Sequence, residues 1–201
     1  MTLGPATLGL TAAIQYAQNS QNLPIMPSYW FAPLEWMKMN TCNGSLIFTW
    51  WDYGYFVSYW GRRLPVIDNS YQPDARVIDV AKTVIGSDPV LAKSIMAKYL
   101  AEDKMQRAYY LITSEELALM PVIRYAATYN VTTGESAGIS PVPESILSNS
   151  LYHRLYYSNA TVGSQPVSGF QLAYKSPEVQ LYRIILPPSE DSIAAGGAAC
   201  T

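Results

Sequence analysis

The side chains best suited to binding chemistry stand next to one another in this sequence, as Trp50, Trp51, Asp52, Tyr53 and Gly54. They follow an apolar run, and we expect residues 46–52 to form a strand in which successive side chains face opposite sides. A turn at Gly54 would then gather two indole N–H donors and one carboxylate acceptor around a small group. Such a set suits a hydroxyl, which both donates and accepts. The alternative is a half-buried strand in which Asp52 accepts from a neighbouring backbone amide.

Other catalytic chemistry has little support in the sequence. His153 is the only histidine, so a Ser-His-Asp or Cys-His arrangement would have to be built around it. A lone histidine beside Arg154 is more typical of a surface or packing residue. Cys42 and Cys200 lie far apart and lack the spacing of zinc ligands, and the sequence leaves open whether they pair. We therefore expect no metal site among these residues.

The composition predicts one folded domain that binds neutral ligands. In a chain of 201 residues, 49% are hydrophobic, which is enough to bury a core. Only 14% are charged, well below the usual quarter, while tyrosine occurs 16 times. A surface rich in tyrosine and poor in charge suits peptide or hydroxylated ligands. The net charge of −2 provides no basic surface for nucleic acid.

Turn and capping signals divide the chain into helices and strands. Helices are expected over residues 1–20, from Pro33 to Met39, over 73–84, after an Asp88 cap, from a Ser114 cap to about residue 129, and over 145–157. Further strands are expected over residues 108–113 and, as a hairpin, over 169–174 and 179–186. The pattern predicts a mixed α/β fold with a helix-rich core around a small sheet. Residues 1–132 would form this core, 133–188 a β-rich part of the same unit, and 189–201 a disordered tail.

The motif of residues 50–54 (WWDYG) matches the signature of the catalytic subunits of the asparagine-linked oligosaccharyltransferases. Upstream, Trp30 and residues 33–41 resemble the family's short helix that ends in an Asn-Thr pair. Downstream, residues 61–63 (GRR) and 66–69 (VIDN) resemble its Gly-x-Arg and Asp-Asn segments. Roughly residues 28–125 thus resemble the C-terminal globular domain of an archaeal member of this family.

A second part of the predicted site lies in the helix after Ser114. Pro121 removes a backbone donor within an apolar helical pattern and predicts a kink. In the family, a kinked helix at this place carries a motif that lines the peptide pocket, and Met120 and Ile123 match its Met-x-x-Ile version. Other versions of this motif begin with an Asp and include a Lys. Asp103 and Lys104 lie before the strand expected at 108–113 and are not equivalent to those residues. The same spacing is also typical of two core residues.

The resemblance implies a function that belongs to a larger enzyme. Such enzymes transfer a lipid-linked oligosaccharide to the asparagine of Asn-x-Ser/Thr in an acceptor polypeptide. Asp52 would then recognise the Ser/Thr hydroxyl, no residue of this domain would be catalytic, and the isolated domain would be inactive. The divalent metal, Mn or Mg, and the lipid-linked oligosaccharide would bind to a transmembrane region, which is a further expected partner. The domain would lie on the extracellular face of the cell membrane.

Two other classes of function remain open from the residues. One is a carbohydrate-binding or glycoside-processing domain, in which Trp50 or Trp51 stacks on a sugar. A glycosidase needs two facing carboxylates, and only Asp52 and Asp68 could be proposed, without motif support. The other is a tyrosine-rich extracellular interaction module. Binding of Asn-x-Thr peptides, compared with binding of simple oligosaccharides, would distinguish the three.

Overall fold

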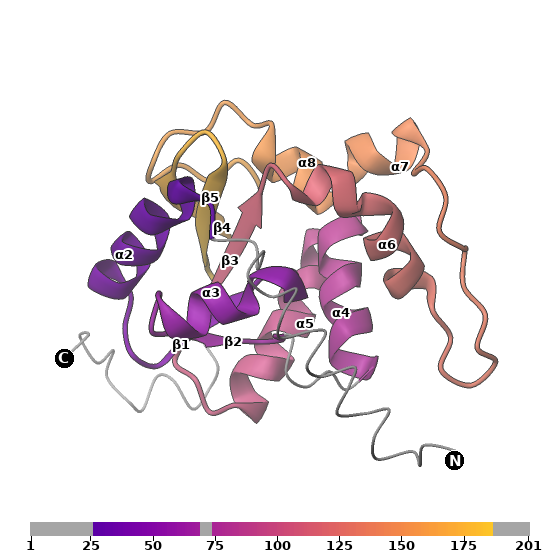
Figure 1. Cartoon of the computed structure of the whole chain (residues 1–201), viewed down its shortest axis with the longest axis horizontal. Helices are drawn as coiled ribbons and strands as arrows, with labels where there is room; N and C mark the ends of the chain where they lie inside the picture. The colour runs from indigo at the N-terminus through magenta and orange to yellow at the C-terminus, as the bar shows by residue number, and fades with distance from the viewer. Residues whose placement is uncertain (1–25, 69–73, 187–201) are drawn as a thin grey trace, which may run out of the picture.

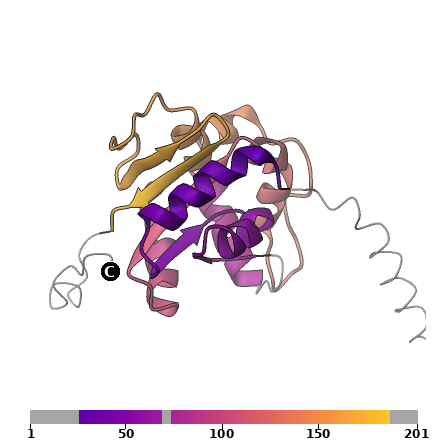
Figure 2. The same ribbon diagram turned by 60° about the vertical axis from the view of Figure 1, so that its left-hand side comes forward.

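A mixed β-sheet runs through the molecule, with helices on both of its sides (Figures 1 and 2). The computed structural model describes residues 26–68 and 74–186. Within these residues the sheet has five strands, in the order β2-β1-β3-β5-β4. The strands are β1 (Ser45–Phe48), β2 (Leu64–Pro65), β3 (Arg107–Thr113), β4 (Phe170–Lys175) and β5 (Val179–Ile184). Strand β1 pairs in parallel with β2 and β3, whereas β3 and β4 pair antiparallel with β5. The predicted mixed α/β class is confirmed.

The helices follow the strands in the order expected for crossover connections between parallel strands. They are α2 (Phe31–Asn40), α3 (Gly54–Tyr59), α4 (Asp74–Ile85), α5 (Pro89–Glu102), α6 (Glu116–Thr128), α7 (Glu144–Asn149) and α8 (Leu151–Tyr156). Two short 3₁₀ helices, η2 (Ser28–Trp30) and η3 (Trp51–Tyr53), precede α2 and α3. Helix α2 crosses the sheet on the side opposite α4 and α5 (Figures 1 and 2). Strand β1 is buried along its whole length, as parallel strands covered on both faces are.

Several predicted elements are confirmed because their local signals agree with their packing. Pro33 lies in the first turn of α2, where its missing N–H is no loss. The side chain of Asp88 caps α5 by accepting from the Val90 N–H at 2.8 Å. Strands β4 and β5 form the expected hairpin, and β5 joins them to β3, so residues 133–186 add two strands to the same sheet. The predicted helix over 1–20 and the tail at 189–201 lie outside the described residues.

Three predicted boundaries are wrong, each for an identifiable reason. The strand predicted over 46–52 ends at Phe48, because the Tyr53 N–H donates to the Trp50 carbonyl and closes a 3₁₀ turn. Ser114 does not cap α6, since its N–H donates to the Glu178 carbonyl and continues the β3–β5 pairing. The helix predicted over 145–157 is two helices, because Ser150 is extended and its hydroxyl accepts from the His153 N–H as the cap of α8.

The end of α2 is closed by a buried arginine from the segment after α3. The Arg63 Nε donates to the Thr41 hydroxyl at 2.7 Å, and Nη2 donates to the carbonyls of Lys38, at 2.8 Å, and Thr41. These acceptors include carbonyls that the last turn of a helix leaves unpaired. The Asn-Thr and Gly-x-Arg segments, which are far apart in the sequence, therefore form one structural unit.

Replacing this arginine tests how much the unit contributes to stability. We expect Arg63→Met to lower the free energy of unfolding by about 2–4 kcal/mol, because it leaves several buried acceptors without a donor. Arg62→Met is the matched control, since Arg62 is exposed, and should change the free energy by less than about 0.5 kcal/mol. Urea denaturation followed by circular dichroism measures both. Equal effects of the two substitutions would contradict a structural role specific to Arg63.

Candidate functional site

The WWDYG segment (residues 50–54) turns away from the end of β1 instead of extending it. Trp50 is extended, the next three residues form η3, and Gly54 begins α3. Trp50 and Tyr53 are buried, Asp52 is half-buried, and Trp51 is 36% exposed. The strand alternation predicted for these side chains is therefore wrong. The segment presents one indole and one carboxylate toward solvent and anchors the other two aromatic rings in the core.

Gly54 is required at its position by a backbone that passes directly against it. A Cβ atom on Gly54 would lie 2.5 Å from the Ile67 carbonyl oxygen and 2.5 Å from the Asp68 Cα. Such distances are far inside van der Waals contact, and backbone atoms cannot rotate away as a side chain can. On the other side of the segment, the ring of Trp30 lies 5.1 Å from that of Tyr53. The motifs upstream and downstream of WWDYG thus pack against it from two sides.

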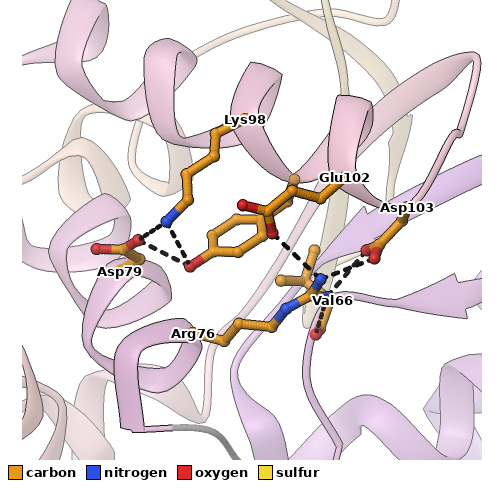
Figure 3. Close-up of polar contacts among 7 residues, drawn as sticks. Val66, Arg76, Asp79, Lys98, Glu102 and Asp103 are labelled. Atoms are coloured by element: carbon orange, nitrogen blue, oxygen red, sulfur yellow. Dashed lines mark hydrogen bonds and ion pairs between the residues drawn. The ribbon is translucent and has the colours of Figure 1, made fainter.

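The segment that packs on Gly54 is itself held by a charged cluster between α4 and α5 (Figure 3). Arg76 of α4 forms two hydrogen bonds with Asp103, at 2.7 and 2.9 Å, and donates a weaker one of 3.4 Å to the Val66 carbonyl. The guanidinium also lies 4.7 Å above the ring centroid of Tyr99. The contact with Asp103 raises the pKa of Arg76. Because the pairing is bidentate and partly buried, it fixes the position of residues 66–68 better than a single ion pair would.

A cavity of about 320 Å³ lies between η3, α4 and α6. None of the eight described residues that line it carries a charge: Trp50, Trp51, Val77, Ile78, Val122, Tyr125, Ala126 and Tyr129. Both tryptophans of the motif form part of its wall. Met120 and Ile123, which the sequence predicts to line a peptide pocket, are not among the lining residues and are buried in the core. The residues of α6 that face the cavity are instead Val122, Tyr125 and Ala126, which are close to the predicted ones in the sequence.

A polar region surrounds Asp52, near the start of α6. Burial raises the pKa of the Asp52 carboxyl, the Trp50 indole counteracts this, and repulsion from Glu115 adds to it. The buried Trp50 N–H lies close enough to the carboxylate to favour its ionised form. Glu115 accepts from the Tyr29 hydroxyl. The site thus contains a half-buried carboxylate and a buried indole donor side by side.

A second carboxyl, Glu116, lies entirely inside the protein, and the sequence analysis did not identify it. Its oxygens have no hydrogen-bond partner among the described side chains, and burial raises its pKa well above the ordinary range. Its charge would act on Tyr53, Tyr110 and Tyr152, whose pKa values are raised mainly by burial. The signal was present in the sequence, because residues 116, 120 and 123 follow a helical spacing that places Glu116 on the buried face with Met120 and Ile123.

The described residues contain neither a metal centre nor a membrane span. No group of three or more His, Cys, Asp or Glu side chains in residues 26–68 and 74–186 could hold a metal ion. No helix in these ranges is long and apolar enough to cross a bilayer. Cys42 is buried. Its possible disulfide partner in the sequence, Cys200, lies outside the described residues.

Substituting Gly54 tests whether the backbone contact positions the site. We expect Gly54→Ala to destabilise the protein by about 1–3 kcal/mol, because the new methyl displaces residues 67 and 68. Gly44→Ala is the matched control, since its Cβ would meet only the Gln106 side chain, at 3.7 Å. Thermal unfolding compares the two variants. A Gly54→Ala protein as stable as the control would show that this contact is not tight in solution.

The buried Glu116 predicts a pH dependence of stability. In the unfolded chain this carboxyl ionises near pH 4.3, whereas in the folded protein it stays protonated to a higher pH. The unfolded state then binds fewer protons, so the free energy of unfolding falls as the pH rises above about 4.3. We expect Glu116→Gln to remove this fall and to be the more stable form at neutral pH. Parallel pH profiles of the two proteins, measured by urea denaturation, would contradict this expectation.

No protein-family model matches the chain, but parts of it are similar in sequence to known proteins. It is 33% identical over 58 residues to dolichyl-phosphooligosaccharide-protein glycotransferase 2 of Pyrococcus horikoshii, a match that covers 29% of this chain and 8% of that protein. It is also 33% identical over 73 residues to the dolichyl-phosphooligosaccharide-protein glycotransferase of Methanocaldococcus jannaschii, covering 36% of this chain and again 8% of the relative. The matches therefore span only a small part of these curated proteins.

Solved structures of other proteins share the fold of this chain over most of its length. The C-terminal globular domain of an oligosaccharyltransferase from Archaeoglobus fulgidus superposes with a TM-score of 0.54 at 21% identity, covering 81% of this chain and 98% of that domain. The C. jejuni PglB C-terminal domain also gives a TM-score of 0.54, at 10% identity, covering 78% of this chain and 100% of that domain. The resemblance predicted from the WWDYG segment is confirmed: the chain has the fold of the C-terminal globular domain of the oligosaccharyltransferases, and the curated proteins that it matches are catalytic subunits of such enzymes.

Proposed function

We propose that this chain is the acceptor-recognition domain of a membrane oligosaccharyltransferase, which transfers a lipid-linked oligosaccharide to the asparagine of Asn-x-Ser/Thr. The observation that carries the proposal is the half-buried Asp52 carboxylate, which lies beside the buried Trp50 indole and is partly desolvated. A Ser or Thr hydroxyl would donate to this carboxylate. A side chain without the hydroxyl would cover the carboxylate without providing a donor, which gives strong discrimination.

The electrostatics of Asp52 support a role in binding. Its raised pKa means that the protein environment does not favour the free carboxylate. A hydroxyl that donates to the ionised form would lower this pKa, so the ligand adds a favourable interaction to that of the Trp50 indole. Binding should then weaken as the pH falls through the pKa of Asp52, which lies above the ordinary value of an aspartate.

Helix α6 would support this site through both of its faces. Met120 and Ile123 are fully buried, so they would anchor the helix and hold the cavity wall from beneath. The resemblance makes Met120 and Ile123 part of the peptide pocket, and contact of the buried Ile123 with an acceptor side chain would require a movement of α6. Pro121 would be the place of such a movement, because the helix lacks one backbone donor there.

Catalysis would take place outside this chain. The described residues offer no set of ligands that fits the Mn or Mg ion implied by the resemblance, so no step of the reaction is assigned to them. The metal, the lipid-linked oligosaccharide and the activated amide would belong to a transmembrane region, on the extracellular face of the cell membrane. In this division, the present domain holds the acceptor polypeptide and is inactive alone.

Substitution of Asp52 tests the proposed function. In the enzyme that contains this domain, we expect Asp52→Ala to reduce glycosylation of an Asn-x-Thr peptide roughly 10- to 100-fold, the effect of one lost hydrogen bond in a buried site. The melting temperature should stay unchanged, because folding does not favour the carboxylate that is removed. Asp88→Asn is the control, since asparagine also caps a helix. If activity falls only in proportion to a lowered melting temperature, Asp52 is structural and the proposal is wrong.

A further inference from the structure

The cavity between η3, α4 and α6 has a chemistry that hydroxyl recognition does not explain. Its wall consists of aromatic and aliphatic side chains, without a single charge. A Ser or Thr side chain has only two or three heavy atoms, whereas a volume of about 320 Å³ reaches the lower end of the range for ligand pockets, about 300–1,000 Å³. Trp51 is 36% exposed and Val122 37% exposed, so the cavity is open to solvent at both of these walls. An apolar group of considerable size can therefore enter it.

The cavity is linked to Asp52 through the two tryptophans of the motif. Trp50 and Trp51 line the cavity and directly precede the carboxylate in η3. Along α6, Glu115 lies next to Asp52 at one end, and Val122 and Tyr129 line the cavity further along. At 1.5 Å per residue, these two walls lie about 10 and 20 Å from Glu115 along the helix axis. An extended peptide advances about 3.3 Å per residue, so three to six residues separate the two places.

We propose that this cavity is a second subsite for the acceptor polypeptide, which binds an aromatic or large aliphatic side chain three to six residues from the Ser/Thr. The inference rests on the proposed function, because the polar region at Asp52 sets the position of the peptide. The occupant follows from the wall: Trp51, Tyr125 and Tyr129 offer ring faces and edges, and no charged group is present to pair with an acidic or basic side chain. A charged side chain would lose its hydration there without compensation.

The subsite would add selectivity among acceptor sequences that share the same Asn-x-Ser/Thr triplet. Burial of a large apolar side chain is favourable, and such contacts improve affinity without any change in the hydroxyl contact. Polypeptides that are not yet folded expose aromatic and aliphatic side chains, which folded proteins bury. A domain with this subsite would accordingly favour acceptor segments that are still unfolded.

The first experiment tests the cavity with small probes and this 201-residue chain. In NMR titrations, N-acetylphenylalanine amide should shift the Trp51 indole and the amides of Val122 and Ala126, with a Kd at least tenfold lower than that of N-acetylaspartate amide. Val122→Asp should abolish the difference, because it places a charge in the cavity wall. Val90→Asp is the matched control, since Val90 is 67% exposed on α5 and lies outside the cavity. Equal binding of the two probes, or shifts confined to other surfaces, would overturn the proposal.

The second experiment separates this inference from the proposed function. The enzyme that contains the domain is given Asn-Ala-Thr peptides with Phe or Asp at each position three to six residues from the Thr, on both sides. The Phe peptides should have at least a tenfold higher kcat/KM at one or more positions, and Val122→Asp should remove this preference. Replacing Thr by Val in the peptide tests the hydroxyl contact alone. Loss of transfer with Val but no preference for Phe would overturn the subsite only, whereas a preference for Phe without dependence on Thr would overturn the proposed function only.

Discussion

The contact between the backbone of Gly54 and the backbone of residues 67 and 68 is the constraint on which the site depends. It allows η3 to turn away from the sheet immediately after β1, where a side chain at Gly54 would force the two segments apart. The second segment has its own anchor in Arg76, which is fixed by Asp103 and donates to the Val66 carbonyl. The position of Asp52 therefore depends on a sequence of contacts that leads back to α4 and α5, far from the motif in the sequence.

Several polar groups are buried in the interior next to the site. The Trp50 indole, the Tyr110 hydroxyl and the Glu116 carboxyl are among them. Burial of a polar group opposes folding unless its hydrogen bonds compensate the lost hydration, so the surrounding packing must offset what remains. All three surround the region where β1, β3 and α6 meet, which is also where the site is built. Buried polar atoms without a close partner among the described residues also occur at Trp30, Ser45 and Thr49, so the core around the site is polar at several places.

The sequence alone predicts those elements whose local signals and tertiary packing coincide. The Asp88 cap, Pro33 in the first turn of α2 and the apolar run of β3 are such cases, because each residue type suits both its backbone position and its burial. The prediction fails where distant segments decide the outcome. The strand stops at Phe48, where the 3₁₀ turn that follows packs against residues 67 and 68, and the Ser114 N–H donates to the Glu178 carbonyl next to β5, so residue 114 extends the strand pairing. The motif residues could be found from the sequence, but the cavity could not, since its walls come from three elements.

Helix α6 shows how one element serves both the core and the site. Glu116, Met120 and Ile123 lie on its buried face, whereas Val122, Tyr125 and Ala126 face the cavity. Pro121 lies where the cavity wall begins, and it removes one hydrogen bond between the two halves of the helix. Met120 and Ile123, one on each side of Pro121, are buried and hold both halves, so adjustment to an occupant falls to the side chains that line the cavity. A site that must accept many different sequences around one fixed triplet needs this combination, since the hydroxyl contact has to be rigid while the neighbouring apolar wall has to adapt.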